Sequence, residues 1–125
     1  MDKKKVLIVE DEEEIANILE DILNIYEADA VIAPQGSAAL NALEKQSINF
    51  VISDITLPDT DGIELYQFIK SKYPTLSDRF LFMSGHSIDD QMEKFLSETG
   101  NSYIQKPFHI NDLQEKIKKY LKHPF

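Results

Sequence analysis

The sequence contains no cysteine, and its basic residues are few compared with its acidic ones. Without cysteine the chain can form no disulfide scaffold, no cysteine nucleophile and no thiolate metal site. Its 13 lysine and arginine residues face 22 aspartate and glutamate residues, which gives a formal net charge of −9. Because non-specific binding to nucleic acid needs a basic face, we expect no direct contact with nucleic acid.

Long hydrophobic runs and internal repeats are also missing. The apolar run Val6–Val9 follows three lysines but ends at Glu10, so it is too short for a signal-peptide core or a membrane span. We therefore expect a cytoplasmic protein that does not contact a membrane. The 125 residues, 42% of them hydrophobic, suffice for one domain with its own core. We expect this single domain over residues 1–125, with its core from about residue 4 to 121 and no output domain.

Short apolar runs alternate with helical patterns along the whole chain. The apolar runs predict five strands near residues 5–9, 30–33, 50–52, 80–83 and 102–105. Apolar residues at helical spacing predict five helices near residues 15–23, 39–43, 65–73, 88–96 and 110–121. Ser37 is the expected N-cap of the second helix, and Glu12 is expected in the first turn of the first. This alternation predicts an α/β fold with a single doubly wound, five-stranded parallel sheet.

Polar residues follow four of the predicted strands. Glu10 and Asp11 follow the first, Asp54 the third, Ser84 the fourth and Lys106 the fifth. Taken singly, each is explained by ordinary loop, cap, turn or surface chemistry. Because the carboxyl ends of parallel strands meet at one edge of the sheet, we expect these side chains to surround one pocket.

Three clustered carboxylates repel one another, so such a pocket calls for a cation. Carboxylate oxygens are ligands that suit Mg²⁺. With a bound ion, Lys106 and Ser84 could surround a phosphoryl group while one carboxylate attacks phosphorus to form an aspartyl phosphate. Catalysis of that step requires mostly positioning and neutralisation of charge.

Four motifs, in this order, resemble those of the receiver domain of two-component response regulators. They are Val9–Glu12, Asp54–Gly62, Met83–Gly85 and Tyr103–Phe108. The resemblance covers about Lys4 to Leu121 and implies the flavodoxin-like strand order 2-1-3-4-5. It also implies a glycine near the start of the third helix, matched by Gly62, and a cis peptide bond between Lys106 and Pro107.

The resemblance implies a role for each residue at the strand ends. Asp54 would be the phosphoacceptor, and Lys106 would pair first with its carboxylate and then with the phosphoryl oxygens. Mg²⁺ or Mn²⁺ would be held by Glu10, Asp11, Asp54 and the backbone carbonyl of Thr56. Glu10 stands where aspartate is commoner in the family. Its extra methylene could place a water between it and the metal, but the charge is kept.

The family also implies a switch and its partners. Ser84 would donate its hydroxyl to the phosphoryl group, Tyr103 would swing inward, and the face from about Ile88 to Leu121 would carry the change to a downstream protein or output domain. The phosphoryl donor would be a histidine kinase or a histidine phosphotransfer domain that packs beside the first helix, Glu12–Tyr26. Such a chain is a signalling phosphoacceptor that assists its own phosphorylation and dephosphorylation, rather than an enzyme.

Three other interpretations compete with this one. An aspartate-nucleophile phosphohydrolase needs an acid two residues after the nucleophile, where this chain has Thr56. A flavodoxin-type cofactor site would place a phosphate beside Glu10–Glu14, which would repel it. The main alternative is a pseudo-receiver, an interaction module that works without phosphorylation. Such modules usually lack a site residue, whereas this sequence has all of them.

Overall fold

The computed structural model describes residues 3–85 and 88–122 as a doubly wound α/β domain. Its five strands are β1 (Lys5–Val9), β2 (Asp29–Ala33), β3 (Phe50–Asp54), β4 (Phe80–Ser84) and β5 (Ser102–Gln105). Its helices are α1 (Glu13–Ile25), α2 (Gly36–Lys45), α3 (Gly62–Lys72), α4 (Asp90–Thr99) and α5 (Ile110–Lys122), with a 3₁₀ turn at Leu76–Asp78. All strand pairs are parallel, and the order is β2-β1-β3-β4-β5. The predicted fold class and strand order are confirmed.

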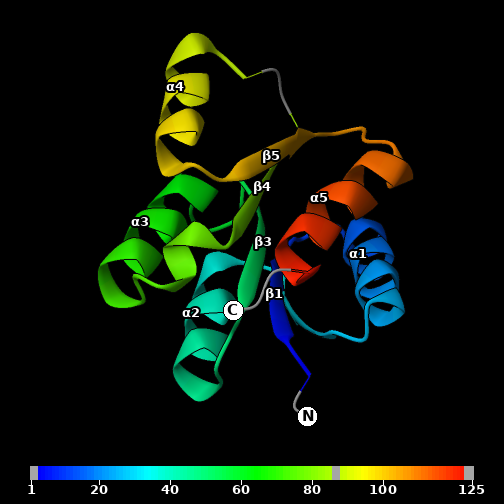
Figure 1. The fold of residues 1–125 in the computed structure, drawn as a ribbon. Coiled ribbons are helices and arrows are strands. Elements are labelled where there is room, and N and C mark those ends of the chain that lie inside the picture. The colour runs from blue at the N-terminus through cyan, green and yellow to red at the C-terminus, as the bar shows by residue number, and fades with distance from the viewer. Residues whose placement is uncertain (1–2, 86–87, 123–125) are drawn as a thin grey trace.

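Helices cover both faces of the sheet (Figure 1). One core cluster joins α1 and α5 to side chains such as Val6, Ile52 and Leu81, and the other joins α2, α3 and α4 to side chains such as Leu7 and Phe82. The central strands β3 and β4 are buried along their whole length, which explains their continuous apolar runs. The edge strands β2 and β5 are more exposed, which explains their weaker sequence signals.

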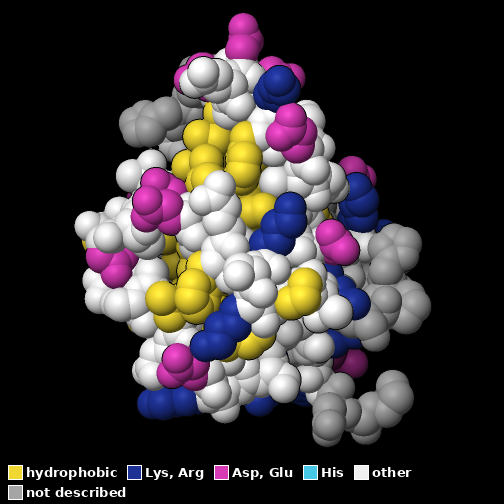
Figure 2. All heavy atoms as spheres, turned by 90° about the vertical axis from the view of Figure 1, so that its left-hand side faces the viewer, with side chains coloured by type: hydrophobic (Ala, Val, Ile, Leu, Met, Phe, Trp, Pro, Cys, Tyr) yellow, Lys and Arg dark blue, Asp and Glu magenta, His cyan; other side chains and the backbone are white. Residues whose placement is uncertain are grey.

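Apolar side chains of two predicted helix faces still reach the solvent. Phe68 of α3 is 41% exposed and Ile110 at the start of α5 is 45% exposed. Figure 2 looks onto the side of the molecule where α4, α3 and α2 lie and shows hydrophobic side chains gathered between charged ones. The helical spacing therefore marks an apolar stripe that is wider than the part buried against the sheet.

The cap of α2 and the start of α4 differ from the sequence prediction. Ser37 is not the N-cap of α2: the cap position is Gln35, and the carboxylate of Asp59 accepts hydrogen bonds from the first turn. A contact between residues so far apart in the chain leaves no local pattern. The helix α4 begins at Asp90, two residues after Ile88, because Asp89 caps it by accepting from the Met92 N–H at 2.8 Å.

Tyr120 links α5 to the amino ends of β3, β4 and β5. Its ring stacks on Phe50 with centroids 4.5 Å apart. Its hydroxyl donates to the Phe80 carbonyl at 2.7 Å and accepts from the Ser102 N–H at 2.9 Å.

Within the described residues, no helix is long and apolar enough to cross a membrane.

Candidate functional site

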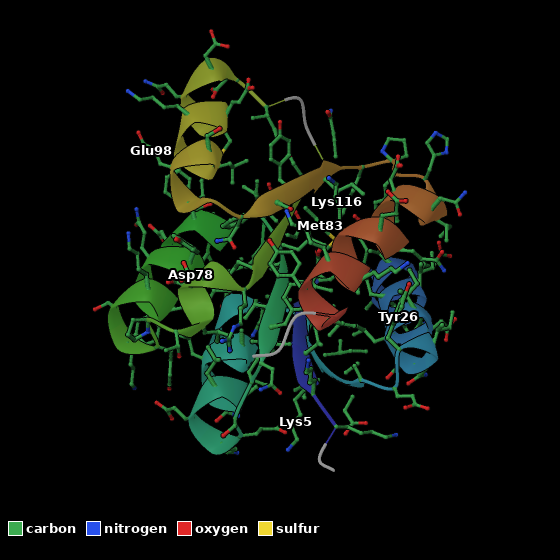
Figure 3. The ribbon with its side chains drawn as sticks, viewed as in Figure 1. Lys5, Tyr26, Asp78, Met83, Glu98 and Lys116 are labelled. Carbon is green, nitrogen blue, oxygen red and sulfur yellow. The ribbon has the colours of Figure 1, made fainter. Side chains whose placement is uncertain are left out.

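The predicted pocket lies at the carboxyl ends of the strands. In Figure 3, Lys5 marks the amino end of β1, and Met83 lies one residue before the carboxyl end of β4. At that carboxyl edge the Lys106 ammonium donates to Oδ2 of Asp54 at 2.6 Å and to Oε1 of Glu10 at 2.7 Å. Three segments far apart in the sequence thus meet at a single ammonium group.

Backbone groups hold the remaining oxygens of these two carboxylates. The Thr56 N–H donates to Oδ1 of Asp54 at 3.1 Å, and the Glu12 N–H donates to Oε2 of Glu10 at 3.0 Å. Each carboxylate is therefore held by a backbone N–H on one oxygen and by Lys106 on the other. This fixes the orientation of both acids before any ligand arrives.

Burial and charge act in opposite directions in this group. Glu10 is 1% exposed and Asp54 is 5% exposed. Burial raises the pKa of Glu10 above its ordinary value, although the hydrogen bonds from Lys106 and the Glu12 N–H oppose this. Burial alone would lower the pKa of Lys106, but hydrogen bonds to Asp54 and Glu10, and their charges, raise it above its ordinary value. The ammonium therefore stays charged at neutral pH and offsets the buried carboxylates.

Three acids offer oxygen ligands in one place. Glu10, Glu12 and Asp54 each provide a carboxylate oxygen, and these atoms lie within 4.8 Å of one another. An all-oxygen donor set of this size fits a hard divalent cation such as Mg²⁺. Asp11, the acid expected from the sequence, is exposed and lines the same pocket, but the three-acid group contains Glu12 in its place. The sequence pattern missed Glu12 because an acid at a helix start has an ordinary electrostatic explanation.

An open cavity of about 430 Å³ lies beside Asp54. Asp11, Thr56 and Lys106 line it, together with Gly85 and the start of the loop between β3 and α3. Polar groups thus face the phosphoacceptor candidate from several segments at once. The cavity leaves room for a small anionic group between Asp54 and the solvent.

Ser84 and Tyr103 lie on neighbouring strands. Ser84 is buried at the end of β4, and its backbone carbonyl accepts from the Lys106 N–H at 2.7 Å. Tyr103 is half-buried on β5, opposite Phe82, and packs against the core cluster under α2, α3 and α4. The peptide bond between Lys106 and Pro107 is cis, as the resemblance implies.

Gly62 lies against the backbone of Asp54, the candidate phosphoacceptor, and of Ile55. A Cβ atom at this position would lie 2.4 Å from the Asp54 backbone oxygen and 3.0 Å from the Ile55 Cα. The Gly62 N–H donates to the Ile55 carbonyl at 2.6 Å. Only glycine allows the start of α3 to approach the end of β3 this closely.

Comparisons with known proteins agree with this geometry. The chain matches the response regulator receiver domain model over residues 6–118. Heme response regulator HssR of Staphylococcus aureus (strain Newman) is 31% identical over 118 residues, which are 93% of this chain and 50% of HssR. The chain thus spans about half the length of this relative.

Solved structures of receiver domains also resemble this chain over nearly its whole length. A CheY-like response regulator receiver domain protein from Methanospirillum hungatei JF-1 has 30% identity and a TM-score of 0.84, over 96% of this chain and 94% of that one. The non-phosphorylated HemR receiver domain from Leptospira biflexa has 26% identity and a TM-score of 0.86, over 98% of each chain.

Proposed function

Since this chain belongs to the response regulator receiver domain family of two-component systems, we propose that it stores a signal as a phosphoryl group on Asp54. The observation that carries the proposal is the contact of Lys106 with both Asp54 and Glu10, at 2.6 and 2.7 Å, beside an open cavity. It joins a nucleophilic carboxylate, a fixed positive charge and a cluster of oxygen ligands.

The reaction is transfer of a phosphoryl group from a phosphohistidine to a carboxylate. One carboxylate oxygen of Asp54 forms the O–P bond while the P–N bond to the donor imidazole breaks. The electron pair of that bond stays on the imidazole nitrogen, which then takes up a proton. The fixed orientation of the Asp54 carboxylate, set by Thr56 and Lys106, favours in-line attack.

The site residues divide the remaining work. Glu10, Asp11, Asp54 and the Thr56 carbonyl would hold Mg²⁺ or Mn²⁺, with Glu12 as a further acid in reach. When bound, the ion would neutralise charge on the phosphoryl oxygens. Lys106 would move from the free carboxylate to the phosphoryl group, and the Ser84 hydroxyl would donate to it.

Phosphorylation would then bias a two-state equilibrium. The added dianion favours the conformation in which Ser84 contacts it, and Tyr103 on the neighbouring strand follows. The face formed by α4, β5 and α5 would carry this change to a downstream protein or output domain. The donor, a histidine kinase or a histidine phosphotransfer domain, would pack beside α1 in the cytoplasm. The domain would also assist its own dephosphorylation.

Labelling with a small phosphoryl donor tests this proposal. Incubation with acetyl phosphate and Mg²⁺ should add one phosphoryl group to the intact mass of the wild type. A chelator should prevent the addition, and Asp54→Asn should show none. Equal labelling of Asp54→Asn would contradict the proposal, and an unlabelled wild type would favour a pseudo-receiver.

A further inference from the structure

The amino end of α2 is capped by a residue from another part of the chain. Asp59, in the loop between β3 and α3, accepts from the Gly36 N–H at 2.7 Å through Oδ1 and from the Ser37 N–H at 3.0 Å through Oδ2. Among the described residues, the local cap position, Gln35, makes no capping hydrogen bond with its side chain. Both oxygens of Asp59 thus serve the first turn of α2, and these bonds hold the pKa of Asp59 below its ordinary value.

Packing brings the same loop onto the same helix turn. A Cβ atom at Gly36 would lie 2.4 Å from the Thr60 methyl carbon and 3.3 Å from Oδ1 of Asp59. Glycine at this position leaves room for the Thr60 methyl group against the first turn of α2. A pair of hydrogen bonds and a close contact between Gly36 and the Thr60 side chain therefore join the loop to α2.

The other end of this loop belongs to the proposed phosphorylation site. The Thr56 N–H donates to Asp54, and Thr56 forms an antiparallel bridge with Asp61. The Leu57 N–H donates to the Thr60 carbonyl at 3.2 Å. The loop is thus closed on itself, and it carries Thr56 on one side and Asp59 on the other.

Packing against the core restrains this loop only in part. Leu57 is buried, whereas Thr56, Pro58 and Asp59 are exposed. The position of the Thr56 carbonyl therefore depends on hydrogen bonds made by the loop as well as on the single buried side chain. The hydrogen bonds that Asp59 accepts from the first turn of α2 tie the loop to a rigid element outside it.

We propose that Asp59 is a positioning residue that holds the Thr56 carbonyl in place for the divalent cation and so links the amino end of α2 to the cation site. This rests on the proposed function of the Asp54 pocket. Groups that orient metal ligands typically change metal affinity by about 10- to 100-fold when they are removed. Because Asp59 acts through the loop backbone, we expect a loss near the lower limit of that range.

An Mg²⁺ titration followed by amide NMR tests the proposal. In the wild type, Mg²⁺ should shift the amide signals of Thr56 and also those of Gly36 and Ser37. In Asp59→Ala the dissociation constant should rise about tenfold, and the signals of Gly36 and Ser37 should no longer follow the titration. Asp59→Asn keeps one carbonyl acceptor and should recover part of the affinity. Gly36→Ala places a methyl group of α2 against the Thr60 side chain and should also raise the dissociation constant for Mg²⁺.

Asp89→Ala is the matched control. It removes another exposed aspartate that caps a helix, α4, by accepting one backbone N–H at 2.8 Å. It should leave the Mg²⁺ affinity unchanged, which separates loop positioning from a general effect of losing a cap. Wild-type affinity in Asp59→Ala would overturn this inference alone. A wild type that shows no saturable Mg²⁺ response would overturn the proposed function and this inference with it.

Discussion

The Nζ atom of Lys106 lies 2.6 Å from Oδ2 of Asp54, although 52 positions separate the two residues in the chain. The same nitrogen lies 2.7 Å from Oε1 of Glu10, which is 96 positions away. One ammonium group therefore offsets two buried carboxylates. Because these three charges contact one another directly, loss of any one of the side chains should disturb the charge balance of the proposed phosphorylation site.

Removing Lys106 should destabilise the domain when no divalent cation is present. Lys106→Ala leaves two buried carboxylates without their counter-charge, and breaking a buried pair in this way costs about 3 kcal/mol. Urea unfolding in the presence of a chelator measures this loss. Excess Mg²⁺ should restore much of the stability, because a cation that binds only the folded state stabilises it.

Lys72→Ala provides the comparison for Lys106→Ala. Lys72 faces Glu44 at 4.0 Å on the exposed surface, where ion pairs contribute less than about 1 kcal/mol. Equal losses of stability in the two variants would contradict the proposed role of Lys106.

Phosphorylated Lys106→Ala should also fail to show the amide shifts that phosphorylation causes in the wild type.

Gly62 should tolerate a methyl group far less well than Gly85. In Gly62→Ala the new Cβ would collide with the backbone of Asp54, and overpacking of this kind costs about 1–3 kcal/mol. Labelling by acetyl phosphate should also slow, because the end of β3 must shift. At Gly85 a new Cβ would meet none of the described atoms within 4 Å, so Gly85→Ala should stay within about 1 kcal/mol of the wild type. Urea unfolding of the two variants side by side decides the matter.

Tyr120 should make stability depend on pH in the alkaline range. Burial raises its pKa above the ordinary value of 10.0, against the opposing effect of the Ser102 N–H. Because the unfolded chain then ionises first, the contribution of the neutral phenol is complete below pH 10.0 and is lost as pH rises above it.

The variant Tyr120→Phe measures this contribution. It should lose about 1–3 kcal/mol near neutral pH, because the Phe80 carbonyl and the Ser102 N–H lose their partner. The difference from the wild type should shrink in urea titrations at pH values above 10.0. Tyr73→Phe, which breaks only a 3.4 Å contact with the Leu43 carbonyl, should lose less stability than Tyr120→Phe near neutral pH. A constant gap between Tyr120→Phe and the wild type would exclude this role for Tyr120.

Ser84 should transmit phosphorylation to Tyr103. Ser84→Ala keeps β4 but removes the hydroxyl, so Asp54 should still be labelled while the aromatic NMR signals of Tyr103 change much less than in the wild type. Ser71→Ala, at an exposed position of α3, should respond as the wild type does. A full Tyr103 response in labelled Ser84→Ala would show that the switch does not pass through this hydroxyl.

The fold could be predicted from the sequence because its signals are local and repeated. Runs such as Phe50–Ile52 are apolar on both faces, which is the pattern of a strand covered on both sides. The site followed from topology, since parallel strands bring residues such as Glu10, Asp54 and Lys106 to one edge. The resemblance to receiver domains then supplied expected roles that local patterns alone left open.

The sequence could not reveal contacts between residues that are distant in the chain and meet only in the folded domain. Aspartate is common in turns, so Asp59 does not stand out in the sequence. Its hydrogen bond from the Gly36 N–H forms only when α2 and the β3–α3 loop meet. Glu12 has an ordinary place at a helix start, and it joins the same acidic group as Asp54 only because the fold pairs β1 with β3. The sequence predicts Ser37 as the N-cap, but a carboxylate from outside the helix caps α2 instead.

Chemical identification of the phosphorylated residue tests the central claim most directly. After labelling with acetyl phosphate and Mg²⁺, borohydride reduces an acyl phosphate to an alcohol, which converts phosphoaspartate to homoserine. Peptide mass spectrometry should then find homoserine at position 54 and aspartate at position 11. Homoserine at any other aspartate, or its absence from a chain that carries the added phosphoryl mass, would contradict the assignment of Asp54 as the phosphoacceptor.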